Sequence, residues 1–144
     1  MIRAAIVTVS DKGSQGQRED LSGPEAARIL ATAEIEVLSI QIVPDEVEEI
    51  KEILIELADR QEADIIVTTG GTGVSPRDVT PEATRAVLER EIPGMGEAMR
   101  RAGLEVTPHA MLSRALAGIR GRTLIVNLPG SPRGVRENLA VILP

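Results

Sequence analysis

The stretch DIIVTTGGTGVSPRDVTPEATRAVLER, residues 64–90, determines the fold class that we expect for this chain. It begins with a short apolar run rich in β-branched residues, at 64–69, which is typical of a buried strand. A glycine-rich loop follows at 70–79. Thr80 with Pro81 then predicts the first turn of a helix that runs to about Arg90. A strand, a loop and a helix in this order form the repeating unit of a parallel sheet.

The same order recurs along the rest of the chain. Ser22 and Glu25 have the spacing of a capping box, which predicts the start of a helix. Residues 94–120 are less regular and predict one or two short helices with a break at Pro108. We therefore expect one α/β domain over residues 1–144, a three-layer, doubly wound and mostly parallel sheet with helices on both faces. The further strands are expected at 2–9, 35–43 and 123–128, with helices after them near 22–30, 47–58 and 135–142.

Composition excludes several classes of protein. The chain has 144 residues, a net charge of -6 and no Phe, Tyr or Trp, so neither a phosphate-neutralising surface nor an aromatic platform for nucleic acid is expected. It has no cysteine and one histidine, His109, which excludes thiolate chemistry and zinc sites of several histidines. No apolar run is long enough to span a membrane. We expect a cytoplasmic protein that binds neither nucleic acid nor membranes.

The glycine-rich loop suggests a site for phosphate. Gly70, Gly71 and Gly73, with Thr72 among them, follow a buried strand directly. Backbone N–H groups without Cβ atoms nearby approach an anion closely, and threonine hydroxyls add donors. The loop is not a Walker A motif, because no Gly-Lys-Ser/Thr sequence ends it. Taken alone, a loop of this kind is more often an ordinary tight connection between a strand and a helix.

Two aspartates follow neighbouring strands. Asp45 comes after the second strand and Asp78 comes after the glycines. Ligands of such sheets bind at the carboxyl ends of the strands, so the two side chains are candidates to hold Mg²⁺ with a substrate phosphate. Arg77 is placed to complement negative charge beside the metal. The alternative for Asp45 is a helix cap, because Glu48 follows it at capping-box spacing.

Two further loops have binding character. The loop from Ser10 to Gly23 is long for its position and carries Lys12 and Arg18. The loop that follows the last strand offers an amide, a hydroxyl and a helix N-terminus, where anions bind readily. The residues alone assign no role to Ser113 and Arg114. The candidate residues of the last loop are Asn127, Pro129, Gly130 and Ser131.

These segments together resemble a known family. The chain is similar to the molybdopterin adenylyltransferases, the MogA and MoaB-like proteins of molybdenum cofactor biosynthesis. The resemblance covers nearly the whole chain and rests on six motifs in the same order. The motifs are SDKGSQGQREDLSG at 10–23, VPDE at 43–46, TTGGTG at 68–73, RDVTPEAT at 77–84, MLSRALAGI at 111–119 and NLPGSP at 127–132.

The resemblance implies an activity and a set of site residues. It implies transfer of AMP from MgATP to the terminal phosphate of molybdopterin, by a homotrimer that supplies a molybdate-inserting enzyme downstream. It implies Asp45 and Asp78 as catalytic, metal-binding residues. The chain is closer in length to the shorter, MoaB-like members, which leaves a non-catalytic trimeric protein that binds the pterin or scaffolds partners as the alternative. The residues that we expect to bind cofactor or substrate are Ser10, Asp11, Gly70, Gly71, Thr72, Gly73, Arg77, Ser113, Asn127, Pro129, Gly130 and Ser131.

Overall fold

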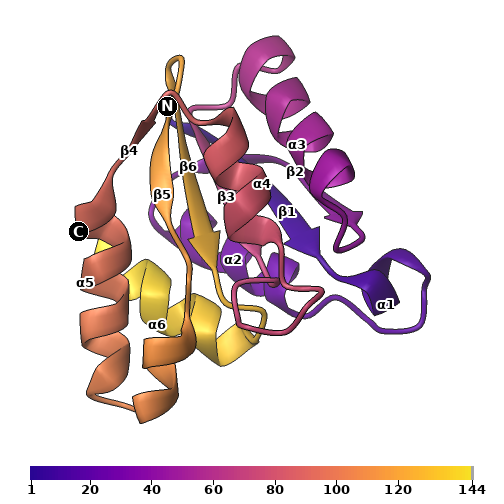
Figure 1. The fold of residues 1–144 in the computed structure, drawn as a ribbon. Coiled ribbons are helices and arrows are strands. Elements are labelled where there is room, and N and C mark those ends of the chain that lie inside the picture. Colours follow the sequence, from indigo (N-terminus) through magenta and orange to yellow (C-terminus); the bar gives the residue numbers. More distant parts are fainter. Residues whose placement is uncertain (144) are drawn as a thin grey trace.

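A computed structural model describes residues 1–143, which form a six-stranded sheet between two layers of helices (Figure 1). The strand order is β2-β1-β3-β6-β5-β4. The first four strands in this order are parallel, whereas β5 pairs antiparallel with β6 and β4 pairs antiparallel with β5. The prediction of a mostly parallel, three-layer α/β fold is confirmed. The strands are β1 (Arg3–Val9), β2 (Glu36–Val43), β3 (Ile65–Thr69), β4 (Arg90–Glu91), β5 (Ala117–Arg120) and β6 (Thr123–Leu128).

The helices divide between the two faces of the sheet. On β1, the side chains of Ala4 and Ile6 face a cluster formed with α2, α5 and α6, and those of Ala5 and Val7 face a second cluster formed with α3 and α4. This alternation follows from the two-residue period of a strand. The helices are α1 (Asp11–Ser14), α2 (Ser22–Thr32), α3 (Val47–Ile55) with a π-helical turn at Glu56–Arg60, α4 (Thr80–Val87), α5 (Pro93–Leu104), a 3₁₀ turn at Pro108–Leu112, and α6 (Pro132–Ile142).

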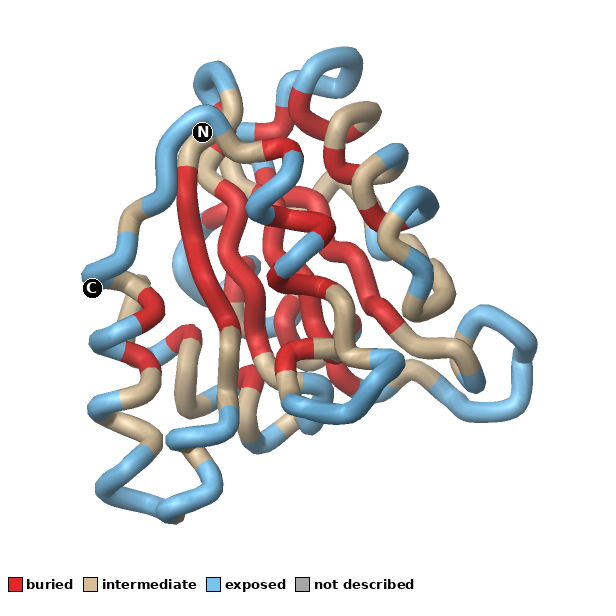
Figure 2. Tube along the Cα trace, in the orientation of Figure 1, coloured by how far each residue is buried: buried red, intermediate tan, exposed pale blue. Residues whose placement is uncertain are grey.

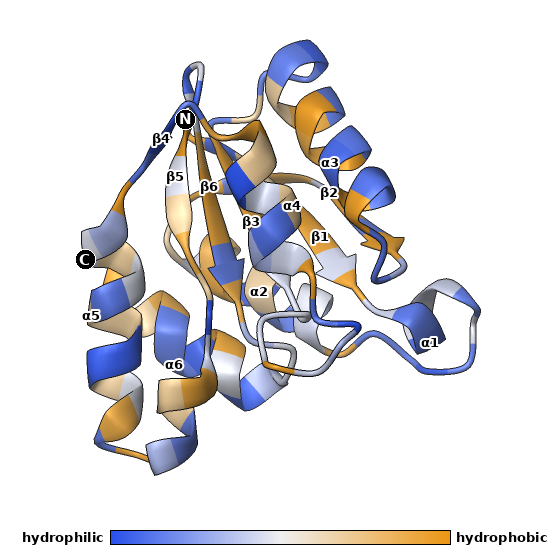
Figure 3. Ribbon diagram, viewed as in Figure 1, coloured by the Kyte–Doolittle hydropathy of each residue, from blue (hydrophilic) through white to orange (hydrophobic). Residues whose placement is uncertain are grey.

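An aliphatic core holds these layers together. The central strands are buried along most of their length, and they consist mostly of hydrophobic residues (Figures 2 and 3). Ile50, Leu54 and Leu57 are fully buried between α3, its π-helical turn and the sheet. Full burial of such a side chain contributes about 1.5–3 kcal/mol to the free energy of folding. The core of this chain, which has no aromatic residues, therefore depends on many buried Ile, Leu and Val side chains. None of the helices in residues 1–143 has the length and apolar character to cross a membrane.

Strands β4 and β5 were not predicted from the sequence. Strand β5 is a four-residue segment that forms because it folds back on β6. Only Gly121 and Arg122 connect the two strands, and Gly121 has φ of 58°. A glycine with positive φ at the first position of a two-residue turn is typical of a type II′ hairpin. The Gly-Arg pair between two apolar runs was therefore the available signal.

Two predicted helix caps are wrong, and both corrections concern residues near the candidate site. Ser22 lies inside α2 and its hydroxyl donates to the carbonyl of Gly130. Asp20 accepts from the N–H of Gly23 at 2.9 Å and so satisfies a donor of the first turn. Helix α3 begins at Val47, and its N-cap residue is Glu46, whose side chain makes no capping hydrogen bond. Asp45 therefore does not cap this helix. The carboxylate of Asp45 instead accepts from the backbone N–H of Asp11, which follows β1.

A buried polar network fixes the centre of the sheet. The side chain of Asn127, on β6, is fully buried and donates to the hydroxyls of Thr68 on β3 and Thr84 on α4, both at 3.0 Å. Its carbonyl oxygen accepts from the N–H of Leu116 at 3.3 Å. Each polar atom of the amide therefore has a protein partner. The network ties two strands and a helix together in the interior.

We predict that Asn127→Ala lowers the free energy of unfolding by about 1–3 kcal/mol, because the change leaves buried hydrogen-bonding groups unpaired. Urea denaturation measures this loss. Asn138→Ala is the matched control, because the Asn138 amide donates only to a carbonyl of its own helix, Gly134, at 2.7 Å. The control is expected to lose no more than about 1 kcal/mol. Equal losses in the two variants would contradict the structural role of Asn127.

Candidate functional site

The parallel register places four loops at one edge of the sheet. Val9 pairs with Val43, Thr8 pairs with Thr69, and Thr69 pairs with Leu128, so the four strands end at nearly the same level. The loops after β1, β2, β3 and β6 therefore meet there, as expected for the ligand edge of such a sheet. They enclose a cavity of about 770 Å³, which we call the polar cavity.

The polar cavity brings together most of the residues predicted for the site. Asp45 and Asp78 both line it, although they are distant in the sequence. Asp11, Glu19 and Asp20 add three carboxylates from the loop after β1. The other predicted residues that line the polar cavity are Ser10, Gly70, Gly71, Arg77, Gly130 and Ser131.

Asp11 and Asp45 exchange hydrogen bonds between backbone and side chain. The N–H of Asp11 donates to Oδ2 of Asp45 at 2.9 Å, and the N–H of Asp45 donates to Oδ1 of Asp11 at 3.0 Å. Bonds from backbone N–H groups to carboxylates are charge-assisted and stronger than neutral ones. The pair therefore fixes the ends of β1 and β2 relative to each other, and with them one wall of the polar cavity.

Arg77 reaches across from the loop after β3 to the same wall. Its Nε and Nη2 donate to both oxygens of Asp11 at 3.0 and 2.9 Å, and Nη2 also donates to Oε1 of Glu46 at 2.9 Å. The guanidinium bonds hold the pKa of Asp11 below its ordinary value, with a smaller contribution from the N–H of Asp45. Most of the positive charge of Arg77 is thus balanced by Asp11 and Glu46 within the protein.

Asp45 is in a different electrostatic position. Burial raises the pKa of its carboxyl above the ordinary value, and the charges of Asp11 and Asp78 raise it further, against the lowering effect of the Asp11 N–H bond and of Arg77. A raised pKa means that the charged form is disfavoured unless a cation approaches. Asp78, the other predicted catalytic carboxylate, lines the same cavity as Asp45 and contributes to this raised pKa.

Two glycines of the loop after β3 lie against these carboxylates. Gly71 has φ of 69°, and a Cβ atom there would lie 3.1 Å from Oδ1 of Asp45 and 2.3 Å from the hydroxyl of Thr80. A Cβ atom at Gly73 would lie 2.9 Å from Oδ2 of Asp78. The loop backbone therefore lies close to both carboxylates, and at Gly71 the positive φ and the neighbouring hydroxyl of Thr80 favour glycine.

The donor set of the polar cavity suits a hard cation. Asp45 uses Oδ2 for the bond from Asp11, and its Oδ1 faces Gly71. Oδ2 of Asp78 accepts from the N–H of Ser75 at 3.0 Å. Residues 1–143 contain no group of three or more His, Asp or Glu side chains arranged to enclose a metal ion by themselves. Two carboxylates plus substrate oxygens remain a typical set for Mg²⁺.

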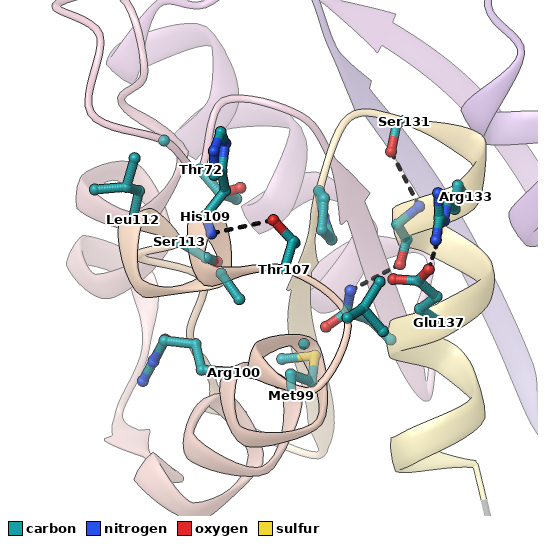
Figure 4. Close-up of a pocket in the computed structure, with 17 residues that line it drawn as sticks. Thr72, Met99, Arg100, Thr107, His109, Leu112, Ser113, Ser131, Arg133 and Glu137 are labelled. Atoms are coloured by element: carbon teal, nitrogen blue, oxygen red, sulfur yellow. Dashed lines mark hydrogen bonds and ion pairs between the residues drawn. The ribbon is translucent and has the colours of Figure 1, made fainter.

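A second cavity of about 550 Å³ adjoins the first, and we call it the apolar cavity. Met99 on α5 and Leu112 on the 3₁₀ turn line it (Figure 4). Val106, which follows α5 in the sequence, lines it as well. Arg100 and Arg133 border it from α5 and α6 (Figure 4). The predicted residues that line the apolar cavity are Thr72, Gly73, Ser113, Pro129 and Ser131.

The glycine loop forms the partition between the two cavities. Gly70 and Gly71 line the polar cavity, and Thr72 and Gly73 line the apolar one. Ser131, at the start of α6, lines both, and its hydroxyl accepts from the N–H of Gly134 at 3.0 Å. Ser131 is therefore a wall residue common to the two cavities. Asn127 lines neither cavity, because its side chain is buried in the network described above.

The apolar cavity and the carboxylates of Glu19 and Asp20 were not predicted as parts of the site. The apolar cavity forms where α5, the 3₁₀ turn and α6 meet, and the irregular pattern of residues 94–120 did not predict that arrangement. Asp20 lines the polar cavity and accepts from the hydroxyl of Thr8 at 2.8 Å. The signal for Asp20 was its position in the long loop after β1, next to the start of α2.

Residues 5–144 match the model of a protein family described as "Probable molybdopterin binding domain". The chain is 43% identical over 145 residues to the molybdopterin adenylyltransferase of Helicobacter pylori strain J99, a match that covers 99% of this chain and 82% of that protein. It is 45% identical over 149 residues to gephyrin of Dictyostelium discoideum, covering 96% of this chain but 21% of the much longer gephyrin.

A solved structure gives the same result. The molybdopterin biosynthesis enzyme MoaB of Thermus thermophilus superimposes with a TM-score of 0.95 and 54% sequence identity, over 100% of this chain and 91% of that one. The family model, the relatives and the fold agree over nearly the whole length. The chain therefore belongs to the family of molybdopterin-binding domains of molybdenum cofactor biosynthesis.

Proposed function

We propose that this protein is a molybdopterin adenylyltransferase, a nucleotidyltransferase that moves AMP from ATP to the terminal phosphate of molybdopterin and releases pyrophosphate. Relatives of this name are 41–43% identical over nearly the whole chain. The observation that carries the proposal to this chain's own residues is the placement of Asp45 and Asp78 on one cavity beside the glycine loop. We further propose that residues 1–144 act as a single domain.

The polar cavity is assigned to the triphosphate of ATP. Its lining has five carboxylates, from Asp11, Glu19, Asp20, Asp45 and Asp78, against three cationic side chains, from Lys12, Arg18 and Arg77. An acid-rich surface repels a triphosphate unless a divalent cation lies between them. Asp45 and Asp78 would hold Mg²⁺ there, which neutralises charge on the departing pyrophosphate.

The transfer itself requires no covalent intermediate with the protein. A terminal phosphate oxygen of molybdopterin attacks the α-phosphorus of ATP in line. The new P–O bond forms as the bond between the α-phosphorus and the oxygen that leads to the β-phosphate breaks, and that oxygen leaves with pyrophosphate. The backbone N–H of Gly71 and the hydroxyls of Ser10 and Ser131, which line the polar cavity, are assigned to the phosphates. The N–H of Gly70 is not, because it donates to the carbonyl of Leu128 at 3.0 Å. Positioning and charge stabilisation then supply the rate.

The apolar cavity is assigned to the pterin ring. Met99, Val106 and Leu112 offer aliphatic and thioether contacts to a flat heterocycle, and Arg100 and Arg133 lie at its border. Arginine planes stack on conjugated rings, which suits a chain without aromatic side chains. Ser113 and Thr72 supply hydroxyls for the ring's polar edge. The phosphate of a pterin bound there points past Ser131 toward the polar cavity, where the α-phosphorus lies.

The wider setting rests on the sequence resemblance alone. We propose a cytoplasmic homotrimer that uses Mg²⁺ and passes its product to a molybdate-inserting enzyme. The non-catalytic alternative, a trimeric pterin-binding or scaffold protein on the same fold, is decided by one assay. Molybdopterin and MgATP are incubated with the protein, and adenylylated molybdopterin is measured by mass spectrometry. Product above the control without protein supports the transferase, and its absence supports the alternative.

We predict that Asp45→Asn and Asp78→Asn each reduce the rate of AMP transfer by about 100-fold or more while the fold is retained. The charge stabilisation by a bound metal is worth several kcal/mol, and each loss of about 1.4 kcal/mol is a tenfold loss in rate. Steady-state formation of adenylylated molybdopterin measures the rate, and circular dichroism checks the fold.

Asp59→Asn is the matched control for both variants. Asp59 lies at the opposite edge of the sheet, where it pairs with Arg120 at 2.8 Å. We expect the control to transfer AMP at the wild-type rate. Wild-type turnover in both Asp45→Asn and Asp78→Asn would refute the catalytic assignment of the two carboxylates.

We predict that ATP binds at least about tenfold more weakly in EDTA than in excess Mg²⁺, because the acid-rich lining then faces the triphosphate directly. Isothermal titration calorimetry with α,β-methylene-ATP measures the two affinities without turnover. In Asp45→Asn the difference between EDTA and Mg²⁺ should shrink. An affinity that is independent of Mg²⁺ in the wild-type protein would contradict the metal assignment.

A further inference from the structure

Arg114 connects the glycine loop, which separates the two cavities, to the segment after the 3₁₀ turn and to α4. Arg114 follows the 3₁₀ turn at Pro108–Leu112 and makes four hydrogen bonds. Its backbone N–H donates to the carbonyl of Thr72 at 2.8 Å, its Nε to that of Gly73 at 2.8 Å and its Nη2 to that of Asp78 at 2.6 Å. Its Nη1 donates to the carboxylate of Glu82 on α4.

The loop from Thr72 to Asp78 has little else to fix its position. Val74, Ser75, Pro76 and Arg77 are exposed, so apolar packing does not hold this part of the chain. Within the loop, the N–H of Asp78 donates to the carbonyl of Ser75 at 2.9 Å. Arg77 ties the loop to Asp11 and Glu46 on the polar side. Arg114 supplies the corresponding attachment on the apolar side.

The geometry of these bonds differs from that of a simple ion pair. A surface ion pair contributes little to stability. Here three carbonyl groups, at both ends of the loop, accept from a single residue whose guanidinium is a rigid planar fork. The carbonyl of Asp78 belongs to the residue assigned to the metal, and Thr72 and Gly73 line the apolar cavity. The fork therefore sets where the loop lies between the two cavities.

We propose that Arg114 is a positioning residue for AMP transfer, which holds the loop Thr72–Asp78 so that Asp78 faces the metal and Thr72 faces the apolar cavity. This proposal rests on the proposed function. Arg114 follows directly after Ser113, which lines the apolar cavity, and it bonds the backbone carbonyl of Asp78, whose side chain lines the polar cavity. It acts through the loop and touches no reacting atom.

The test compares Arg114→Ala and Arg114→Lys with two controls. Glu82→Gln removes the charge of the ion-pair partner and leaves the three carbonyl bonds. Arg120→Ala removes an arginine with similar bonds, to Asp59 and to the carbonyl of Val87, from the opposite edge of the sheet. A displacement of about 1 Å in a catalytic group costs on the order of 100-fold in rate, so we expect kcat in Arg114→Ala to fall by about 10- to 100-fold. Arg114→Lys should recover little, whereas both controls stay within about threefold of wild type.

Two readouts separate positioning from general stability. Added guanidinium should restore part of the activity of Arg114→Ala and none of that of Asp78→Asn, because the cation can refill the fork's site. Mg²⁺-dependent binding of α,β-methylene-ATP should weaken in Arg114→Ala, although Tm falls by no more than about 5 °C. Equal loss of kcat in Arg114→Ala and Glu82→Gln, or unchanged binding and kcat in Arg114→Ala, would overturn the proposal.

Failure of the proposed function has a different signature. If the wild-type protein binds α,β-methylene-ATP with Mg²⁺ but forms no adenylylated molybdopterin, the transferase assignment fails. The positioning role is then still decided by the binding comparison between wild type and Arg114→Ala. If the wild-type protein shows no Mg²⁺-dependent binding, both proposals are overturned.

Discussion

The common level at which four parallel strands end is the constraint on which the site depends. Four parallel strands lie side by side in the order β2, β1, β3 and β6. Because they end at nearly the same level, the loops that follow them meet at one edge of the sheet. Residues separated by tens of positions, such as Asp11, Asp45 and Asp78, become neighbours for that reason alone. A shift of one strand by one residue in the register would turn the side chains of that strand to the opposite face of the sheet. It would also displace the loop that follows that strand.

Electrostatics then distinguishes the carboxylates that the fold has gathered. Asp11 is satisfied by Arg77 and by a backbone N–H, and its pKa is lowered. The pKa of Asp45, a hydrogen-bonding partner of Asp11, is raised by burial and by its acidic neighbours. Arg77 and a backbone N–H favour the charged form of Asp11, whereas burial and acidic neighbours disfavour the charged form of Asp45. Perturbation of this kind, by burial together with named charges, is typical of functional sites.

Much of this was predictable from the sequence, and the failures have physical causes. Buried parallel strands produce runs such as IRAAIVTV and DIIVTT, which are recognisable without any partner. β5 has no such signal, because its strand character comes from pairing with β6. Asn127 was expected to contact a ligand because it begins the loop after an apolar run. Its amide turns inward instead, since Thr68 and Thr84 offer partners that only the folded sheet brings within reach. Ser22 and Asp45 fitted capping patterns that tertiary contacts overrode.

The loop between the cavities shows why arginine is used where packing is impossible. The loop brings its backbone close to two carboxylates at Gly71 and Gly73, and glycines have no side chains that could pack into a hydrophobic core. The carbonyl groups of such a loop remain available as acceptors, and the guanidinium of Arg114 bonds two of them, those of Gly73 and Asp78. Arg77 reaches out of the loop to Asp11, and Arg114 reaches into the loop to Gly73, so the loop is attached on both sides where Gly71 and Gly73 lie close to the carboxylates. In this chain, glycines let the loop backbone lie close to the carboxylates, and the bonds of Arg77 and Arg114 hold it there.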